Sequence, residues 1–198
     1  MGLDYRDWEA GDTPRTDTMM ILSLEPLNKT GTMVSIPRDL WVSIPGFDHN
    51  KINTAYYLGE VYNTPGGGAA LAARTVEELL GVPIQYYAQI DFQAFVDFID
   101  HIDGVRLTFD EPMVLDRRGK WNTVTIEPGV ITLPGEYALA YVRARKTEGG
   151  DFDRSQRQQE LIMAVRDRIL EFNMMPKLVA RAPEIYNDLA AGINTNMG

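Results

Sequence analysis

The 198-residue sequence contains no cysteine, and this absence excludes several kinds of site at once. Disulfides, thiolate nucleophiles, cysteine-ligated zinc and iron–sulfur clusters all need the thiol group. Histidine is scarce as well, because only His49 and His101 are present. A Ser-His-Asp triad or a multi-histidine metal site would have to rest on these two residues, and neither lies in a local catalytic motif. Both kinds of site are therefore disfavoured.

Positive charge and long apolar runs are also in short supply. Lys and Arg total 19 against 28 Asp and Glu, which gives a net charge of -9. Nucleic-acid binding relies on a basic surface that displaces counterions from phosphates, so we expect no nucleic-acid partner. No apolar run approaches the roughly 20 residues that cross a bilayer. Hydrophobic residues make up 44% of the chain, which is typical of a globular protein of one domain, residues 1–198.

The basic residues that are present are mostly arginine, with 14 Arg against 5 Lys. The planar guanidinium can contact a phosphate or carboxylate through two hydrogen bonds, so a preference for arginine is expected of an anion-binding site. Codon bias explains the same preference without any site. The positions of the arginines along the chain have to decide between the two.

Short apolar runs and helical periodicities alternate along the chain. Strands are predicted at residues 18–24, 32–36, 85–90 and 105–109, and we expect the first two to form a buried pair. Helices are predicted at 52–62, 69–80, 91–102, 134–143, 154–172 and 176–191, with Phe172 on the apolar face of the fifth. Residues 112–129 suggest a hairpin or an excursion outside the core. The pattern indicates an α/β fold, a three-layer α/β/α domain with a central mixed β-sheet.

Charged side chains gather where these predicted elements end. The richest group begins the fifth helix, where Arg154, Arg157 and Gln158 are spaced three and four residues apart and can project from one side. A helix N-terminus favours anions, so this group could cradle a phosphate. The alternative is a solvated helix start with ordinary Asp–Arg ion pairs.

Arginines and aspartates occur together at several element ends, a mixture that suits a pyrophosphate bound with Mg²⁺. Guanidinium groups would neutralise the phosphate oxygens, while one or two carboxylates would hold the cation. Loops and element ends on a rigid α/β scaffold are where such sites are built. The residues concerned are Arg15, Arg38, Arg143, Arg145, Arg154 and Arg157, with Asp4, Asp17, Asp39, Asp151 and Asp153.

At these same positions the chain resembles the LytR-CpsA-Psr family of bacterial cell-envelope proteins. The similarity is carried, in the family's order and spacing, by motifs between about residues 2 and 172. They are Arg15-Thr-Asp-Thr-Met-Met20, Ser35-Ile-Pro-Arg-Asp39, Lys51-Ile-Asn-Thr-Ala-Tyr56, Gln89-Ile-Asp-Phe92, Ile102-Asp-Gly-Val105, Leu133 through Arg145, and Asp151 through Gln159. Asp103 stands where the family more often has glycine.

The resemblance implies a transferase that moves an anionic glycopolymer from a polyprenyl-pyrophosphate carrier to peptidoglycan and leaves a phosphodiester. It also implies that Asp4 and Asp17 hold Mg²⁺ and that Asp151 is a further acid of the site. Charge stabilisation and positioning are expected to carry the catalysis, through Arg38, Arg143, Arg145, Asp151 and Arg154. The pyrophosphate-binding set is Arg15, Arg38, Arg143, Arg145, Arg154 and Gln158, to which the helix spacing adds Arg157.

The resemblance further places the domain on the extracytoplasmic face of the bacterial membrane, attached through an N-terminal anchor that is absent from this sequence. Two other functions stay open. A non-catalytic module could bind polyprenyl-linked or anionic envelope glycans through the same arginines, and a pyrophosphate hydrolase would use water as the acceptor. The carboxylates of Asp4 and Asp17 favour an enzyme, because they would repel an anionic ligand unless a metal ion intervened.

Overall fold

The computed structural model describes residues 1–4, 15–117, 122–144 and 150–197. The chain divides into two compact units, of which the first comprises Met1–Phe92 with Ile193–Gly198 and the second comprises Gln93–Gly192. The last residues of the chain therefore return to the first unit. The single domain expected from the sequence stays a prediction.

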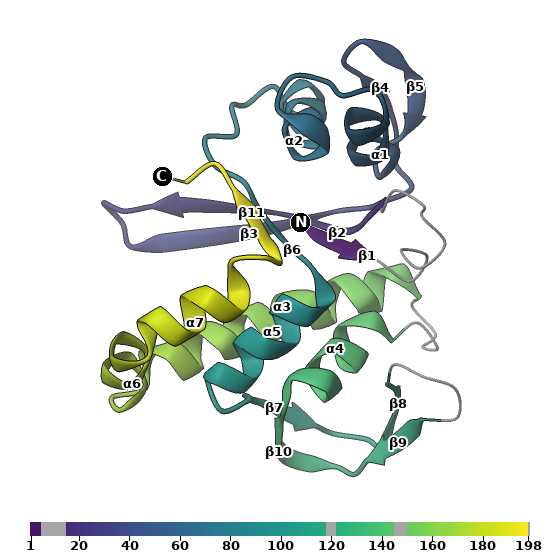
Figure 1. Ribbon diagram of the computed structural model, residues 1–198. Helices are drawn as coiled ribbons and strands as arrows, with labels where there is room; N and C mark the ends of the chain where they lie inside the picture. Colours follow the sequence, from purple (N-terminus) through teal and green to yellow (C-terminus); the bar gives the residue numbers. More distant parts are fainter. Residues whose placement is uncertain (5–14, 118–121, 145–149, 198) are drawn as a thin grey trace. The chain divides into compact units, whose positions relative to one another are not determined.

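The first unit contains a mixed β-sheet, and the other helices and strands of this unit lie on one side of it (Figure 1). Its five strands lie in the order β11-β6-β1-β2-β3, with β1 parallel to β6 and the other neighbours antiparallel. This sheet and the helices that follow confirm the predicted α/β fold class with a mixed sheet. The bounds are β1 Gly2–Asp4, β2 Arg15–Glu25, β3 Thr30–Ile36, β6 Ala88–Ile90 and β11 Ile193–Thr195.

The β2–β3 hairpin is the longest part of this sheet, and only its base is buried. Met19 and Ile36 are register partners and belong to the apolar core of the first unit. Farther along β2, Leu22 and Leu24 are 58% and 67% exposed. The prediction of a buried strand pair is therefore wrong for the outer half of the hairpin, where these side chains are exposed.

Two helices and a small hairpin complete the core of the first unit. The helices cross at two glycines, where a Cβ added to Gly59 would lie 2.5 Å from the Cα of Gly68. The second helix ends at Gly81, whose positive φ of 68° is a conformation that glycine adopts without strain. The bounds are β4 Trp41–Ile44, β5 Phe47–Lys51, α1 Thr54–Val61 and α2 Gly67–Leu80.

The second unit has its own apolar core, built from helices and two antiparallel strand pairs. Leu115 and Ile126 are buried in this core. The stretch 112–129 does form a hairpin, but the expectation that it stays outside the core is wrong, because alternate side chains of its strands pack inward. The bounds are α3 Phe92–His101, β7 Val105–Phe109, β8 Met113–Asp116, β9 Thr123–Ile126, β10 Gly129–Leu133 and α4 Gly135–Arg143.

The remaining helices correct two details of the sequence prediction. The fifth helix ends at Leu170, so Phe172 lies beyond it and is 94% exposed rather than on its apolar face. The predicted C-terminal helix is divided at Arg181, because Pro183 occupies the first turn of a new helix. The bounds are α5 Asp151–Leu170, α6 Met174–Ala180 and α7 Ala182–Leu189. Within the described ranges, no helix combines the length and apolar character that a membrane crossing requires.

Candidate functional site

In the first unit, the structure brings Asp17 and Arg38 together. Asp17 lies on β2, and Arg38 follows the end of β3, which pairs with β2. Nη1 of Arg38 donates to Oδ1 of Asp17 at 2.9 Å, and both side chains are about one-fifth exposed. The antiparallel hairpin thus explains why two residues 21 positions apart in sequence form one ion pair.

The backbone around Arg38 is fixed by the start of α1. The N–H of Asn53 donates to the carbonyl of Arg38 at 3.2 Å, and the N–H of Ile52 donates to the carbonyl of Leu40 at 2.8 Å. Beside them, Nζ of Lys51 donates to Oδ1 of Asp39 at 2.6 Å. This hydrogen bond and the lysine charge hold the pKa of Asp39 below its usual range. The loop that carries Arg38 is therefore held in place by hydrogen bonds to residues 51–53, just before α1.

Asp4 and Arg15, two other predicted site residues, lie on neighbouring strands at the start of β2, the same end that carries Asp17. They are register partners in the antiparallel pair of β1 and β2, and Arg15 precedes Asp17 by two residues. A carboxylate supplies the hard oxygen that Mg²⁺ prefers, and Asp17 is open enough for an ion that keeps several of its waters. The chemistry of Asp17 thus fits the predicted metal ligand.

In the second unit, the predicted anion-binding residues lie at the start of α5. Nη2 of Arg154 lies 3.2 Å from Oδ1 of Asp151, one turn earlier in the helix. This ion pair is the kind expected of an ordinary helix start. Yet Arg154, Arg157 and Gln158 are all buried, with exposed fractions of 7%, 8% and 9%. Burial argues against the solvated helix start, because charged side chains are rarely buried without a specific role.

The buried side chains of α5 also bind the end of α4. Nη2 of Arg157 donates to the carbonyl of Ala144 at 2.5 Å, and Nε2 of Gln158 donates to the carbonyl of Val142 at 3.4 Å. One turn farther along α5, Glu160 accepts a hydrogen bond from another residue of α4. Arg143, which is predicted to bind pyrophosphate, is the last residue of α4 and lies between the two bonded carbonyls.

The hydroxyl of Tyr141 makes this third bond, donating to Oε2 of Glu160 at 2.6 Å. Burial, together with the Glu160 carboxylate, raises the pKa of Tyr141, so that the phenol remains a donor at neutral pH. Sequence analysis missed this pair, because the two residues are 19 positions apart and no local spacing signals their contact.

The predicted site residues are thus divided between the two units. Asp4, Arg15, Asp17 and Arg38 belong to the first unit, and Arg143, Asp151, Arg154, Arg157 and Gln158 belong to the second. Arg145 lies outside the described residues. The assignment of these residues to catalysis, pyrophosphate binding and Mg²⁺ stays a prediction.

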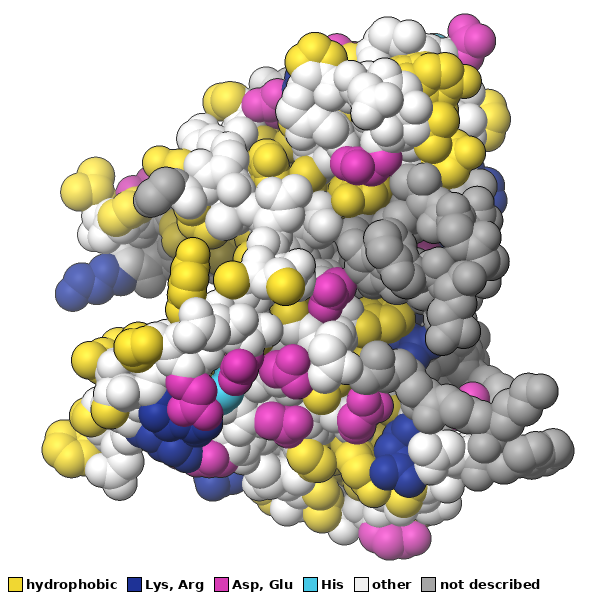
Figure 2. Space-filling view, in the orientation of Figure 1, with side chains coloured by type: hydrophobic (Ala, Val, Ile, Leu, Met, Phe, Trp, Pro, Cys, Tyr) yellow, Lys and Arg dark blue, Asp and Glu magenta, His cyan; other side chains and the backbone are white. Residues whose placement is uncertain are grey.

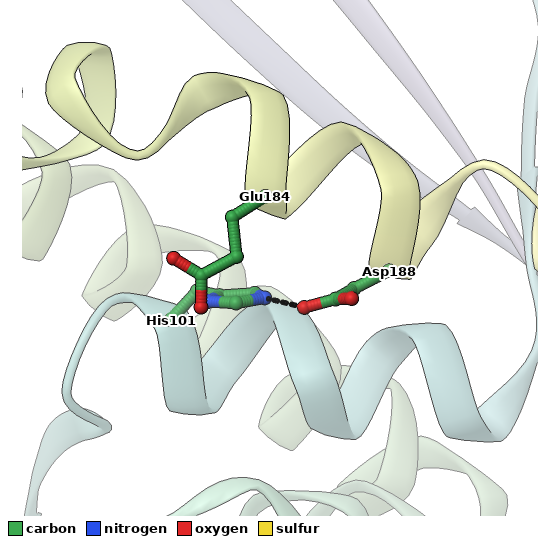
Figure 3. A group of neighbouring side chains, drawn as sticks. All are labelled: His101, Glu184 and Asp188. Atoms are coloured by element: carbon green, nitrogen blue, oxygen red, sulfur yellow. Dashed lines mark hydrogen bonds and ion pairs between the residues drawn. The ribbon is translucent and has the colours of Figure 1, made fainter.

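Within the described part of the second unit, one further group has metal-ligating side chains: His101, Glu184 and Asp188 (Figure 3). Asp188 faces Nε2 of the imidazole at 3.1 Å. At the other ring nitrogen, Nη2 of Arg181 lies 3.2 Å from Nδ1, and the same nitrogen bonds Oε1 of Glu184 at 2.9 Å.

A guanidinium can only donate hydrogen bonds, so the contact with Arg181 requires Nδ1 of His101 to be the acceptor and Nε2 to carry the proton that Asp188 accepts. The place of a cation beside Nδ1 and Glu184 is thus taken by Arg181. Over α6 and α7, Figure 2 shows basic and acidic side chains next to one another. Through these hydrogen bonds, the group attaches α7 to the end of α3.

Comparison with known proteins places the chain in an established family of α/β proteins. The sequence matches the LytR_cpsA_psr family over residues 1–198, and the chain belongs to this family. The resemblance seen in its motifs is thereby confirmed.

Two curated relatives have names that describe an activity. The chain is 36% identical over its whole length to "Polyisoprenyl-teichoic acid--peptidoglycan teichoic acid transferase TagT" of Bacillus subtilis (strain 168). It is 35% identical, again over its whole length, to the transferase TagU of Oceanobacillus iheyensis. In both cases the chain spans 57% of the length of the relative.

A solved structure described as "TagT bound to LI-WTA" is also similar, and the match covers the whole of this chain and 67% of that one. Its TM-score is 0.75 and its sequence identity is 30%.

Proposed function

We propose that this chain transfers an anionic glycopolymer from a polyprenyl-pyrophosphate carrier to peptidoglycan. The observation that carries the proposal is the match, over all of this chain, to TagT, whose name describes the transfer of polyisoprenyl-linked teichoic acid to peptidoglycan. The ion pair of Asp17 with Arg38 and the buried Arg154 supply the carboxylate and guanidinium groups that such chemistry needs.

The proposed reaction is a phosphoryl transfer in which one P–O bond forms and one breaks. A hydroxyl oxygen of peptidoglycan attacks the phosphorus that bears the glycan, and its proton is lost to a base or to solvent. The P–O–P bridge breaks, and polyprenyl phosphate leaves with the bridging oxygen and its electron pair. The product is a phosphodiester between glycan and peptidoglycan.

In this reaction the arginines stabilise the charge that accumulates on the phosphate oxygens. We assign this role to Arg15, Arg38, Arg143, Arg145 and Arg154, with Gln158 as a further donor and Asp151 orienting Arg154 through their ion pair. Fixed guanidinium groups are effective because they require little reorganisation when charge moves to the leaving group. No general base is assigned.

Asp4 and Asp17 are the proposed Mg²⁺ ligands. A bound Mg²⁺ would neutralise charge on the pyrophosphate and so allow carboxylates to stand near an anionic substrate. In its ion pair, Arg38 holds one oxygen of Asp17, which fixes the orientation of the carboxylate. The orienting role of Arg38 explains why a guanidinium contacts a carboxylate directly at a site proposed to bind an anion.

A polyprenyl carrier is a membrane lipid, so the proposed reaction takes place at a membrane surface. We place the domain on the extracytoplasmic face of the bacterial membrane, where peptidoglycan lies, and infer attachment through an N-terminal anchor, as the resemblance implies. The partners are the lipid-linked glycan, peptidoglycan and the membrane.

The test incubates the purified chain with a synthetic polyprenyl-pyrophosphate-linked disaccharide and peptidoglycan fragments, with Mg²⁺ or with EDTA. Mass spectrometry then measures released polyprenyl phosphate and the phosphodiester-linked product. We expect both products, in Mg²⁺ only. Polyprenyl phosphate with a free glycan phosphate would indicate hydrolysis, which is a side activity if the phosphodiester also forms. If the chain bound the ligand but formed neither product, the proposed enzymatic activity would be wrong and a binding module would be favoured.

A further inference from the structure

Arg157 is bonded to the end of a helix, although its spacing in the sequence predicts a phosphate ligand. It is 8% exposed, and its Nη2 donates at 2.5 Å to the carbonyl of Ala144, the residue after the last one of α4. The final carbonyls of a helix have no N–H partner within the helix and carry partial negative charge. A guanidinium at this place satisfies a carbonyl and fixes where the helix ends.

The same contact bears on Arg143. The carbonyls of its two neighbours, Val142 and Ala144, both accept hydrogen bonds from α5, one from Gln158 and one from Arg157. The peptide groups on either side of Arg143 are therefore held by α5. Because the direction in which a side chain leaves the backbone is set by these peptide groups, α5 determines where the guanidinium of Arg143 can reach.

We propose that Arg157 is a positioning residue, which holds the end of α4 and thereby places Arg143, and that it is not itself a pyrophosphate ligand. The inference rests on the proposed function, in which Arg143 binds pyrophosphate. It replaces the role that helix spacing predicted for Arg157. The hydrogen bond between Tyr141, two residues before Arg143 in α4, and Glu160 of α5 supports the same attachment.

The two roles of Arg157 differ in how its loss combines with the loss of Arg143. The experiment measures, by titration calorimetry, the binding of farnesyl pyrophosphate with Mg²⁺ to the wild type, Arg157→Gln, Arg143→Ala and the double variant. A positioning residue acts through Arg143. Arg157→Gln should therefore weaken binding about tenfold when Arg143 is present and less than about twofold when it is absent. Two direct ligands would instead show losses that multiply.

Arg166→Gln is the matched control, because it makes the same change on an exposed face of α5, where Arg166 is 59% exposed beside Asp167. We expect its binding to equal that of the wild type. Amide hydrogen exchange in the absence of ligand should be faster at residues 142–144 in Arg157→Gln and unchanged in Arg166→Gln. This readout reports on the end of α4 independently of substrate.

Tyr141→Phe keeps the test decisive if Arg157→Gln does not fold. It removes one hydroxyl and no charge, and it should weaken binding severalfold only while Arg143 is present. Equal losses in both backgrounds, or no loss in either, would overturn the positioning role. A wild-type protein that binds no farnesyl pyrophosphate would instead overturn the proposed function, and the role of Arg157 within it.

Discussion

Asp17→Asn is the substitution that most directly tests the proposed metal site, because it removes the charge of Asp17 and keeps its shape. In the folded chain this carboxylate accepts a hydrogen bond of 2.9 Å from Arg38, with both side chains about one-fifth exposed. A hydrogen bond to a charged group contributes about 1.5–3 kcal/mol when buried, and an exposed ion pair contributes about 0–1 kcal/mol. We therefore expect a loss of about 1–2 kcal/mol in the free energy of unfolding.

This loss is small enough to leave the chain folded. For a chain of this size it lowers the Tm by about 2–8 °C, which differential scanning calorimetry resolves. The effect on turnover should be much larger. A bound metal ion supplies several kcal/mol of transition-state stabilisation, so Mg²⁺-dependent release of polyprenyl phosphate should fall by about a hundredfold or more. Asp110→Asn, an exposed position between β7 and β8, is the control and should change neither quantity.

The Arg38→Gln background separates the ion pair from the metal. There, Asp17→Asn should cost less stability than in the wild type, because its partner has already been removed. The loss of metal binding should persist, and it can be followed by electron paramagnetic resonance with Mn²⁺ in place of Mg²⁺. Unchanged Mn²⁺ binding in Asp17→Asn, or turnover that resists both this substitution and EDTA, would refute the assignment of Asp17 as a ligand.

Three further predictions concern packing, ligand binding and pH. Gly59→Ala should lower the free energy of unfolding by about 1–3 kcal/mol in urea titrations, because its Cβ would lie 2.5 Å from the Cα of Gly68; equal stability would contradict the close crossing of α1 and α2. Arg143→Ala should weaken binding of farnesyl pyrophosphate by about 1.5–3 kcal/mol with little change in Tm, and Arg143→Lys should recover only part of it; a matching loss of stability would point to a structural role. Chiefly through its hydrogen bond, Lys177 holds the pKa of Asp103 below the usual 3.8, so this pair stabilises the fold above that pH and the contribution disappears as pH falls through the lowered pKa. In Asp103→Asn, the Tm should consequently fall less than in the wild type when the pH is lowered below about 4. The same fall in both proteins would contradict this contribution.

Local pattern was sufficient for most of the helices and strands. The spacing of Phe92, Phe95, Val96 and Ile99 predicted a helix that the structure has at Phe92–His101, and the strand predicted at residues 105–109 has those same bounds. Such elements are set by periodicity and by the residues at their ends, which are properties of neighbouring positions. The arginine-rich motifs were equally visible in sequence, and with them the family.

What the tertiary structure decided depends on which distant residues come into contact. Spacing along α5 placed Arg157 among the phosphate ligands, but the position of α4 beside α5 directs its guanidinium to the carbonyl of Ala144. The pair of Tyr141 with Glu160 and the pair of Asp17 with Arg38 have the same origin, because each joins two elements that only packing or strand pairing brings together. The sequence determined which chemical groups the protein possesses. The partners of those groups were decided by the fold, because a hydrogen bond requires two groups about 3 Å apart and sequence periodicity does not specify that distance.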